Sequence, residues 1–265
     1  MAHHHDSDHD DFGGLHRDLT ATTAMQRREM LRVMLGVGVF TVMGCGNDNS
    51  TGTGNTSDQC SVIPEETEGP YPGDGSNGPD VLGQSGVVRS DIRSSFAGLS
   101  GTAEGVLLTL NLTVISASTC EPLAGYAVYA WHCDREGRYS LYSAGATDQN
   151  YLRGVQQAYA DGKLSFTTIF PACYAGRWPH IHFEVYPSLD AATSVSNKVR
   201  TSQLALPKSV CDQVYAQAGY EQSVTNLSHV SLATDGIFSD GSALQVPSVS
   251  GDVASGYIAS LTVAV

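Results

Sequence analysis

A short segment with strictly alternating side chains is the feature that most restricts the fold of this chain. In His180–Tyr186, apolar residues occupy every second position and polar or aromatic residues occupy the positions between them. Successive side chains of a β-strand point to opposite faces of a sheet. The pattern therefore predicts a strand with one apolar face, and with His180, His182 and Glu184 together on the other face.

Other segments have the length and pattern of short strands separated by turns. Residues 64–80 are rich in proline and glycine, which predicts an irregular loop, and only residues 208–218 have helical spacing. We therefore expect a mainly β protein, folded over residues 60–265 as a single β-sandwich of mixed or antiparallel strands with long active-site loops. The expected strands are 105–116, 124–132, 164–169, 180–186, a segment around Val230, and 257–265.

Charge excludes one class of partner. The 265 residues include 14 Lys plus Arg and 27 Asp plus Glu, which gives a formal net charge of -13, and 41% of them are hydrophobic. Such a chain can bury a full core, but it has no dense basic patch with which to neutralise a phosphate backbone. We expect no nucleic-acid partner.

Residues 1–45 are predicted to be an export signal. Arg27 and Arg28 precede the apolar run Leu31–Gly44, which is shorter than the roughly 20 residues that span a bilayer. The arginine pair resembles the twin-arginine signal of proteins exported in the folded state, with an ordinary secretory signal as the alternative. The run ends in a lipoprotein-like cleavage box at Cys45, whose lipidation would attach the protein to a membrane. We expect residues 46–59 to be a flexible tether and the protein to be exported, to the periplasm or the cell surface.

Cysteine usage agrees with export. The five cysteines that follow Cys45 are widely spread and lack the close spacing of zinc sites. An oxidising compartment favours disulfides. Because five is an odd number, one thiol is expected to stay free, and the spacing leaves the pairing open. These cysteines are Cys60, Cys120, Cys133, Cys173 and Cys211.

The two histidines of the alternating strand have the spacing of a transition-metal site, because side chains two residues apart lie about 7 Å apart along one face. The chain after the lipoprotein-like box has only two other histidines, His132 and His229, and lacks a carboxylate at the spacing of a cupin-type site. Tyr139 and Tyr174 are the candidates for the missing ligands. A phenol has an ordinary pKa near 10, so only a strongly Lewis-acidic ion such as Fe(III) would keep it deprotonated at neutral pH. A single tyrosine is usually structural, and the prediction depends on the combination.

Several motifs follow one another along the chain. They are T-E-G-P-Y at 67–71, R-S-D-I-R at 89–93, W-H-C-D at 131–134, G-R-Y-S at 137–140, Y-L-R-G-V-Q at 151–156, F-T-T-I-F-P at 166–171, Y-A-G-R at 174–177 and H-I-H at 180–182. Their order and spacing resemble those of the intradiol ring-cleavage dioxygenases, which are non-haem Fe(III) enzymes that open catechols between the two hydroxylated carbons. The likeness is closest to the extracytoplasmic branch of that family, which carries the W-H-C-D motif.

The resemblance, carried over residue by residue, implies a ligand set and two further active-site residues. Arg177 matches the family's active-site arginine, and Gln203 matches its glutamine. Tyr142 is close enough to Tyr139 to be the ligand instead, if the register is off by one turn. The four residues that the resemblance assigns to one Fe(III) per chain are Tyr139, Tyr174, His180 and His182.

The resemblance also implies a reaction with a catechol and O2. The catechol would bind the iron through both oxygens, while Tyr174 leaves the iron and takes up a substrate proton. Arg177 would stabilise negative charge on the ring as oxygen attacks, and the product would be a muconate-type diacid. The helical N-terminal dimerisation region of cytoplasmic catechol dioxygenases is missing, so the oligomeric state stays open.

A second function from a different class also fits part of the sequence. Residues 123–128 and 161–166 resemble transthyretin-like β-sandwiches, which serve as binding modules on surface proteins. A lipoprotein of this kind would be a non-catalytic binding protein. The presence or absence of bound iron distinguishes the two hypotheses.

Overall fold

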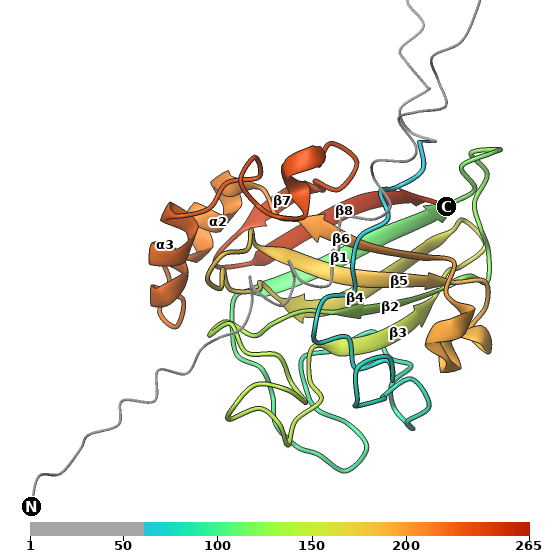
Figure 1. Cartoon of the computed structure of the whole chain (residues 1–265), viewed down its shortest axis with the longest axis horizontal. Coiled ribbons are helices and arrows are strands. Elements are labelled where there is room, and N and C mark those ends of the chain that lie inside the picture. Colours follow the sequence, from blue (N-terminus) through green and yellow to red (C-terminus); the bar gives the residue numbers. More distant parts are fainter. Residues whose placement is uncertain (1–60) are drawn as a thin grey trace, which may run out of the picture.

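The computed structural model describes residues 61–265 of the chain. The predicted export signal at 1–45 and the predicted tether at 46–59 lie outside the described residues. Within residues 61–265, no helix combines the length and the hydropathy needed to cross a membrane. Two four-stranded sheets make up the body of the fold, with the helices α2 and α3 at one end of it (Figure 1).

The first sheet is mixed and has the strand order β4-β1-β8-β7. β1 pairs with β8 in parallel and with β4 antiparallel, and β7 pairs with β8 antiparallel. The strand β8 therefore lies inside the sheet. The strands are β1 (Leu107–Ile115), β4 (Lys163–Ile169), β7 (Ser248–Asp252) and β8 (Gly256–Ala264).

The second sheet is antiparallel throughout and has the order β3-β2-β5-β6. Its inner strands β2 and β5 are buried at every position. With the first sheet it forms a β-sandwich, which confirms the predicted fold class. The strands are β2 (Ala127–Trp131), β3 (Arg153–Gln157), β5 (His180–Tyr186) and β6 (Arg200–Ala205).

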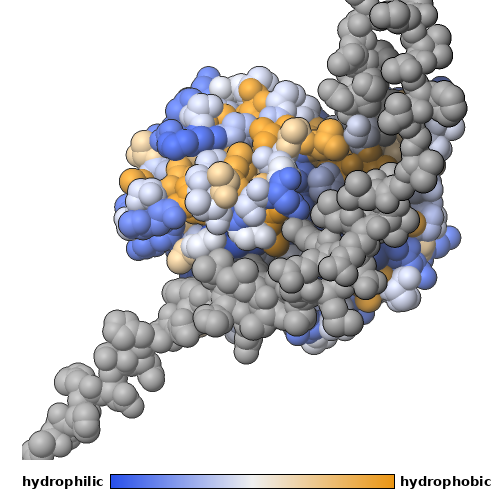
Figure 2. Space-filling view, turned by 45° about the horizontal axis from the view of Figure 1, so that its top comes forward, coloured by the Kyte–Doolittle hydropathy of each residue, from blue (hydrophilic) through white to orange (hydrophobic). Residues whose placement is uncertain are grey.

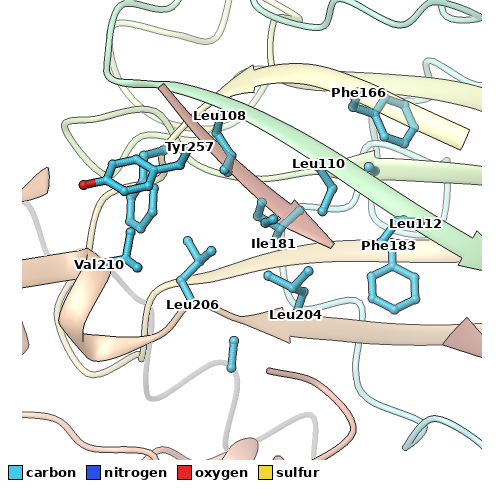
Figure 3. Close-up of a cluster of buried hydrophobic side chains, with 14 of the residues drawn as sticks. Leu108, Leu110, Leu112, Phe166, Ile181, Phe183, Leu204, Leu206, Val210 and Tyr257 are labelled. Atoms are coloured by element: carbon cyan, nitrogen blue, oxygen red, sulfur yellow. The ribbon is translucent and has the colours of Figure 1, made fainter. Parts of the chain in front are cut away.

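The core lies between the two sheets (Figure 3). β1 alternates buried and partly exposed residues, as a strand with one covered face does. Each fully buried Leu, Ile or Phe contributes about 1.5–3 kcal/mol relative to an exposed one. The labelled side chains are Leu108, Leu110 and Leu112 of β1, Phe166 of β4, Ile181 and Phe183 of β5, Leu204 of β6, Leu206, Val210 of α2 and Tyr257 of β8.

The predicted two-faced character of β5 is confirmed. Its apolar residues face the core between the sheets, whereas His180 and His182 lie on the opposite face. That outer face is also covered, because loop residues 71–96 pack against it and form a second apolar cluster with Tyr129 and Trp131. The histidines are therefore buried beneath loops, on a rigid inner strand.

Short helices lie between β5 and the C-terminal hairpin. The helix predicted over 208–218 is present as α2 (Lys208–Val214), and it is followed by α3 (Glu221–Ser228). The strand predicted around Val230 is wrong, because α3 ends two residues earlier and the chain then turns. The 3₁₀ segments are η3 (Ala191–Thr193), η4 (Val195–Asn197) and η5 (Phe238–Asp240). On the face seen in Figure 2, hydrophobic and hydrophilic residues are intermixed.

Candidate metal centre

Four side chains, all predicted as ligands, converge under the loops that cover β5. The Nε2 atom of His180 lies 3.3 Å from Tyr139 Oη, 3.1 Å from Tyr174 Oη and 3.1 Å from His182 Nε2. Two nitrogens and two oxygens therefore meet at one point. Donors that sit about 2.1 Å from a shared ion and at right angles to one another are about 3 Å apart, which is close to the distance from His180 Nε2 to each of the other three atoms.

The tautomer of His180 shows that hydrogen bonding alone does not account for this cluster. His180 Nδ1 lies 2.5 Å from the carbonyl oxygen of Trp178. A carbonyl only accepts, so Nδ1 carries the proton and Nε2 has one lone pair. Three polar atoms surround that single lone pair, although it can accept only one hydrogen bond. A bound cation would be contacted by all four atoms at once.

The second histidine is held by stacking. The ring of His182 lies 4.9 Å from the ring of Trp131, at an interplanar angle of 7°. Its Nδ1 is buried and has no hydrogen-bond partner among the described residues. Burial lowers the pKa of both His180 and His182, and the positive charge of Arg177 lowers them further. Both imidazoles are therefore neutral at physiological pH, which is the form that binds metals.

Tyr139 is placed by a tight turn that follows β2. The Asp134 carboxylate accepts hydrogen bonds from the backbone N–H groups of Glu136 and Arg138, and the Tyr139 N–H donates to Ser143 Oγ. The Tyr139 side chain is only 2% exposed. Burial raises the pKa of its phenol well above the ordinary value, and the neighbouring Tyr174 adds to this effect. Only a strong Lewis acid would convert it to a phenolate.

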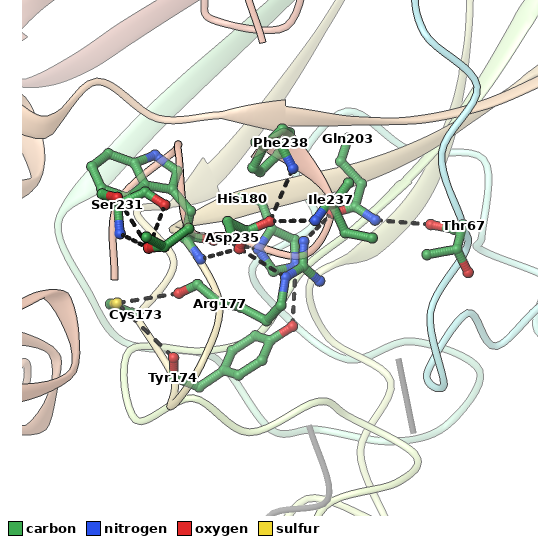
Figure 4. Close-up of polar contacts among 12 residues, drawn as sticks. Thr67, Cys173, Tyr174, Arg177, His180, Gln203, Ser231, Asp235, Ile237 and Phe238 are labelled. Carbon is green, nitrogen blue, oxygen red and sulfur yellow. Dashed lines mark hydrogen bonds and ion pairs between the residues drawn. The ribbon is translucent and has the colours of Figure 1, made fainter. Parts of the chain in front are cut away.

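Tyr174 differs from Tyr139 in its exposure. It lies in the loop between β4 and β5 and is half-buried. Its ring meets the ring of Tyr139 edge-on at 5.9 Å, and its hydroxyl points to His180 (Figure 4). The space beside it depends on Gly137, where a Cβ atom would lie 3.3 Å from the Cβ of Tyr174. Of the two tyrosines, Tyr174 is thus the one that is partly exposed.

The other residues considered as ligands lie elsewhere. His132 is buried against the Cys133 carbonyl and Thr168 Oγ1, and His229 is exposed. Tyr142 accepts a hydrogen bond from the Gly73 N–H and donates one to the Asn77 carbonyl, away from the four donors. Within residues 61–265, no group of three or more His, Cys, Asp or Glu side chains could hold a metal ion. A metal centre in this part of the chain would thus depend on the tyrosines.

Arg177 and Gln203 lie next to the four donors. Gln203 is the cross-strand neighbour of His182 in the pairing of β5 with β6. Arg177 Nη2 donates to Gln203 Oε1 at 2.7 Å, and Gln203 Nε2 donates to the Thr67 carbonyl at 2.9 Å (Figure 4). Both side chains are buried. A cation is therefore fixed beside the cluster.

Two residues of this region have roles that were not predicted from the sequence. Asp235 is fully buried and pairs with Arg177 at 3.0 Å. Burial alone would raise the pKa of Asp235, but the charge of Arg177 and backbone N–H donors outweigh it and lower that pKa. Arg153 is a buried cation that donates to the carbonyls of Tyr71, Pro72 and Ser140. It fixes the loop over the site and the residue after Tyr139. An Asp-Gly pair in a loop and an arginine in a short strand are too common to indicate such roles.

The sequence predicted one free thiol, but three of the described cysteines are free. Cys133, Cys173 and Cys211 are free and buried. Burial raises the pKa of Cys173 to about 12, so the thiol beside Tyr174 stays protonated. It is packed against the backbone of its own loop, with Sγ 3.4 Å from the Arg177 carbonyl. The predicted disulfide stays a prediction.

Comparisons with known proteins show similarity of sequence and of fold. The family described as Dioxygenase matches residues 78–192, a segment that holds all four converging side chains and Arg177. An intradiol ring-cleavage dioxygenase from Tetranychus urticae is 24% identical, with a TM-score of 0.60, over 77% of this chain and 94% of that chain. The crystal structure of another dioxygenase is 25% identical, with the same TM-score and coverage. No curated protein matches the chain. The protein thus has the fold of these dioxygenases, and its central segment is similar in sequence to the Dioxygenase family.

Proposed function

We propose that this protein is a non-haem Fe(III) dioxygenase that cleaves a catechol between its two hydroxylated carbons with O2, giving a muconate-type diacid. The observation that carries the proposal is the convergence of two imidazoles and two phenols on one point, with no carboxylate among them. Soft metals prefer thiolates, and divalent ions such as Zn²⁺ are usually held by His, Cys or carboxylates. Phenolate ligands favour a ferric ion.

Tyr139, Tyr174, His180 and His182 would hold the iron, one per chain. Ferric iron bound there would supply a Lewis acid that binds both oxygens of a catechol and makes its ring reactive toward O2. The buried Tyr139 and the two histidines, fixed on or against β5, would remain in place. The phenolate oxygen of the half-buried Tyr174 would leave the metal. It would then act as a general base and accept a proton from a substrate hydroxyl.

Arg177 would act on the charge that develops on the substrate ring. Its guanidinium is buried, so its field is little screened by water, and its contacts to Asp235 and Gln203 hold it in position. A cation that needs no reorganisation is the arrangement that stabilises a charged transition state best. Gln203 would orient Arg177 through its side-chain oxygen.

The proposal includes a setting outside the cytoplasm. The paired arginines and the lipoprotein-like box support export, with Cys45 as the point of membrane attachment, and the W-H-C-D motif supports the extracytoplasmic branch of the enzymes. A non-catalytic transthyretin-like binding module is the less favoured function, because such a module has no use for two buried neutral histidines facing two tyrosines.

The test is metal analysis and spectroscopy of the purified protein, followed by product analysis with catechol. We expect about one iron per chain, a visible tyrosinate-to-Fe(III) band that shifts when catechol is added, and ring opening between the hydroxylated carbons. His182→Gln, which removes one ligand on the rigid strand, is the matched control and should be nearly colourless. A colourless wild-type protein carrying stoichiometric zinc would refute the proposal.

A further inference from the structure

A single buried carboxylate beside the site accepts four N–H groups. Asp235 Oδ2 accepts from Arg177 Nε at 3.0 Å and from the Trp178 N–H at 2.7 Å. Asp235 Oδ1 accepts from the N–H groups of Ile237 at 2.8 Å and Phe238 at 3.1 Å. A carboxylate has about four lone-pair directions, so this one is fully used (Figure 4).

Asp235 contacts the site along two separate routes. The first runs through the side chain of Arg177, whose Nε is held by Asp235 while its Nη2 reaches Gln203. The second runs through the peptide of Trp178, whose N–H is held by Asp235 and whose carbonyl accepts the Nδ1 proton of His180. One carboxylate thus fixes the direction of the cation and the tautomer of the histidine whose Nε2 faces the cluster.

We propose that Asp235 is the positioning residue of this site, which aims Arg177 at the substrate and keeps the Nε2 lone pair of His180 pointed at the metal position. Its role in turnover rests on the proposed function, but its role in the tautomer of His180 does not. Asp235 lies outside the segment that matches the Dioxygenase family. It is supplied by the turn between α3 and η5, which docks onto the site through this side chain.

The chemistry of the four donors explains why an amide cannot replace the carboxylate. Asparagine has nearly the same shape, but it has one acceptor oxygen, and its NH2 group would face two N–H groups. Asp235→Asn should therefore release the Trp178 peptide or the Arg177 side chain without removing volume. Asp235→Glu keeps the charge and is the conservative rescue. Asp240→Asn, an exposed change in the same segment, is the matched control.

The first experiment needs neither iron nor substrate. Nitrogen-15 NMR of the metal-free wild-type protein should find His180 protonated on Nδ1, with a hydrogen-bond coupling between the Trp178 N–H and the Asp235 carboxyl carbon. Asp235→Asn should give a mixture of His180 tautomers, and Asp240→Asn should leave the signals unchanged. A wild-type His180 protonated on Nε2 overturns the proposal, even if every Asp235 variant fails to fold.

The second experiment measures Fe(III) affinity and steady-state kinetics. Changes to residues that orient a metal ligand typically cost 10- to 100-fold in affinity or activity. We expect Asp235→Asn to lower both the Fe(III) affinity and kcat by 10- to 100-fold, with little change in KM. Asp235→Glu should recover part of the lost affinity and kcat. In an Arg177→Leu background, Asp235→Asn should still weaken iron binding but reduce kcat much less, because one of its two routes is already lost.

The outcomes of the two experiments separate two kinds of failure. If the wild-type protein binds iron and turns over but the kcat losses of Arg177→Leu and Asp235→Asn multiply fully, Asp235 does not act through Arg177. If the wild-type protein binds no iron and does not turn over, the proposed function fails, and the tautomer of His180 still decides whether Asp235 positions it.

Discussion

The unequal burial of the two tyrosines predicts different results when each loses its hydroxyl. Tyr139 is 2% exposed and Tyr174 is half-buried, yet their oxygens lie at nearly equal distances, 3.3 and 3.1 Å, from His180 Nε2. Phenylalanine keeps the ring in both cases, so the edge-on packing of the two rings at 5.9 Å should survive. The difference between the variants should then report chemistry and not folding.

Tyr139→Phe should bind less iron and lose most of the visible band even with substrate present, because this ligand is expected to stay bound throughout. Tyr174→Phe should bind iron and catechol, because its position is vacated in the complex. Its turnover should nevertheless be much slower than that of the wild type, because the variant lacks the phenolate that leaves the iron and acts as the base. General bases contribute about 10²- to 10⁴-fold. At about 1.36 kcal/mol per factor of ten, this loss is roughly 2.7 to 5.4 kcal/mol in the activation free energy.

The assay combines iron content per chain, the visible spectrum with and without catechol, and kcat. Tyr142→Phe is the control, because its hydroxyl bonds to Gly73 and Asn77 and lies away from the donors. It should keep the iron, the colour and most of the rate. Full activity of Tyr174→Phe, with ring opening between the hydroxylated carbons, would show that Tyr174 is not the ligand that leaves.

Three further measurements test the surroundings of the site. Arg153→Met should lower the free energy of unfolding by roughly 2 kcal/mol or more, because the carbonyls of Tyr71 and Ser140 lose the hydrogen bonds from Arg153 at about 1–3 kcal/mol each, whereas the Pro72 carbonyl keeps the Tyr129 hydroxyl. Urea titration checks this, and an equal loss in the more exposed control Arg93→Met would contradict it. Burial lowers the pKa of His132 to about 4, so this side chain stays neutral in the fold while it takes up a proton near pH 6.5 in the unfolded chain. The iron-free protein should therefore lose about 2 kcal/mol of stability from pH 7 to pH 5 through His132 alone, and His132→Gln should flatten the slope by that amount. Mass spectrometry without reduction should find Cys60 joined to Cys120, and the absence of any disulfide would contradict this expectation. Thiol titration of the unfolded protein should then find three free groups beyond Cys45, those of Cys133, Cys173 and Cys211.

The strands that the sequence predicted well are those with one apolar face against the core. β1, β2, β4 and β5 all have this pattern, and β5 was predicted at both ends. β3 and β6 were missed because Arg153 and residues 201–203 are polar yet buried, which breaks the apolar alternation. β7 was missed for the opposite reason, since it is an exposed edge strand with little apolar content. α3 was missed because only Ser223 and Leu227 of its eight residues are buried.

Site residues on a strand could also be predicted from the sequence pattern better than site residues in loops. The two histidines could be placed together from the sequence because they share one strand, where side-chain direction is fixed by the alternation. Tyr139 and Tyr174 lie in loops, where no alternation fixes the side-chain direction. Ligand chemistry made them candidates, but only the family resemblance implied that they join the histidines. Asp235 could not be predicted at all, because its contact with Arg177 joins two loops that no local pattern relates. Long-range contacts between loops depend on the whole fold.

The inner position of β8 has a consequence for how the protein is made. This strand is the last element of the described chain, yet it lies between β1 and β7 and pairs Leu108 with Tyr257. While the ribosome is still adding residues before β8, β1 has an open edge on which no native partner exists. Pairings this distant in sequence form slowly, and open edges invite association between chains. Folding of this sheet should therefore be completed only after β8 has left the ribosome, and a chaperone that covers β1 until then should raise the yield of folded protein.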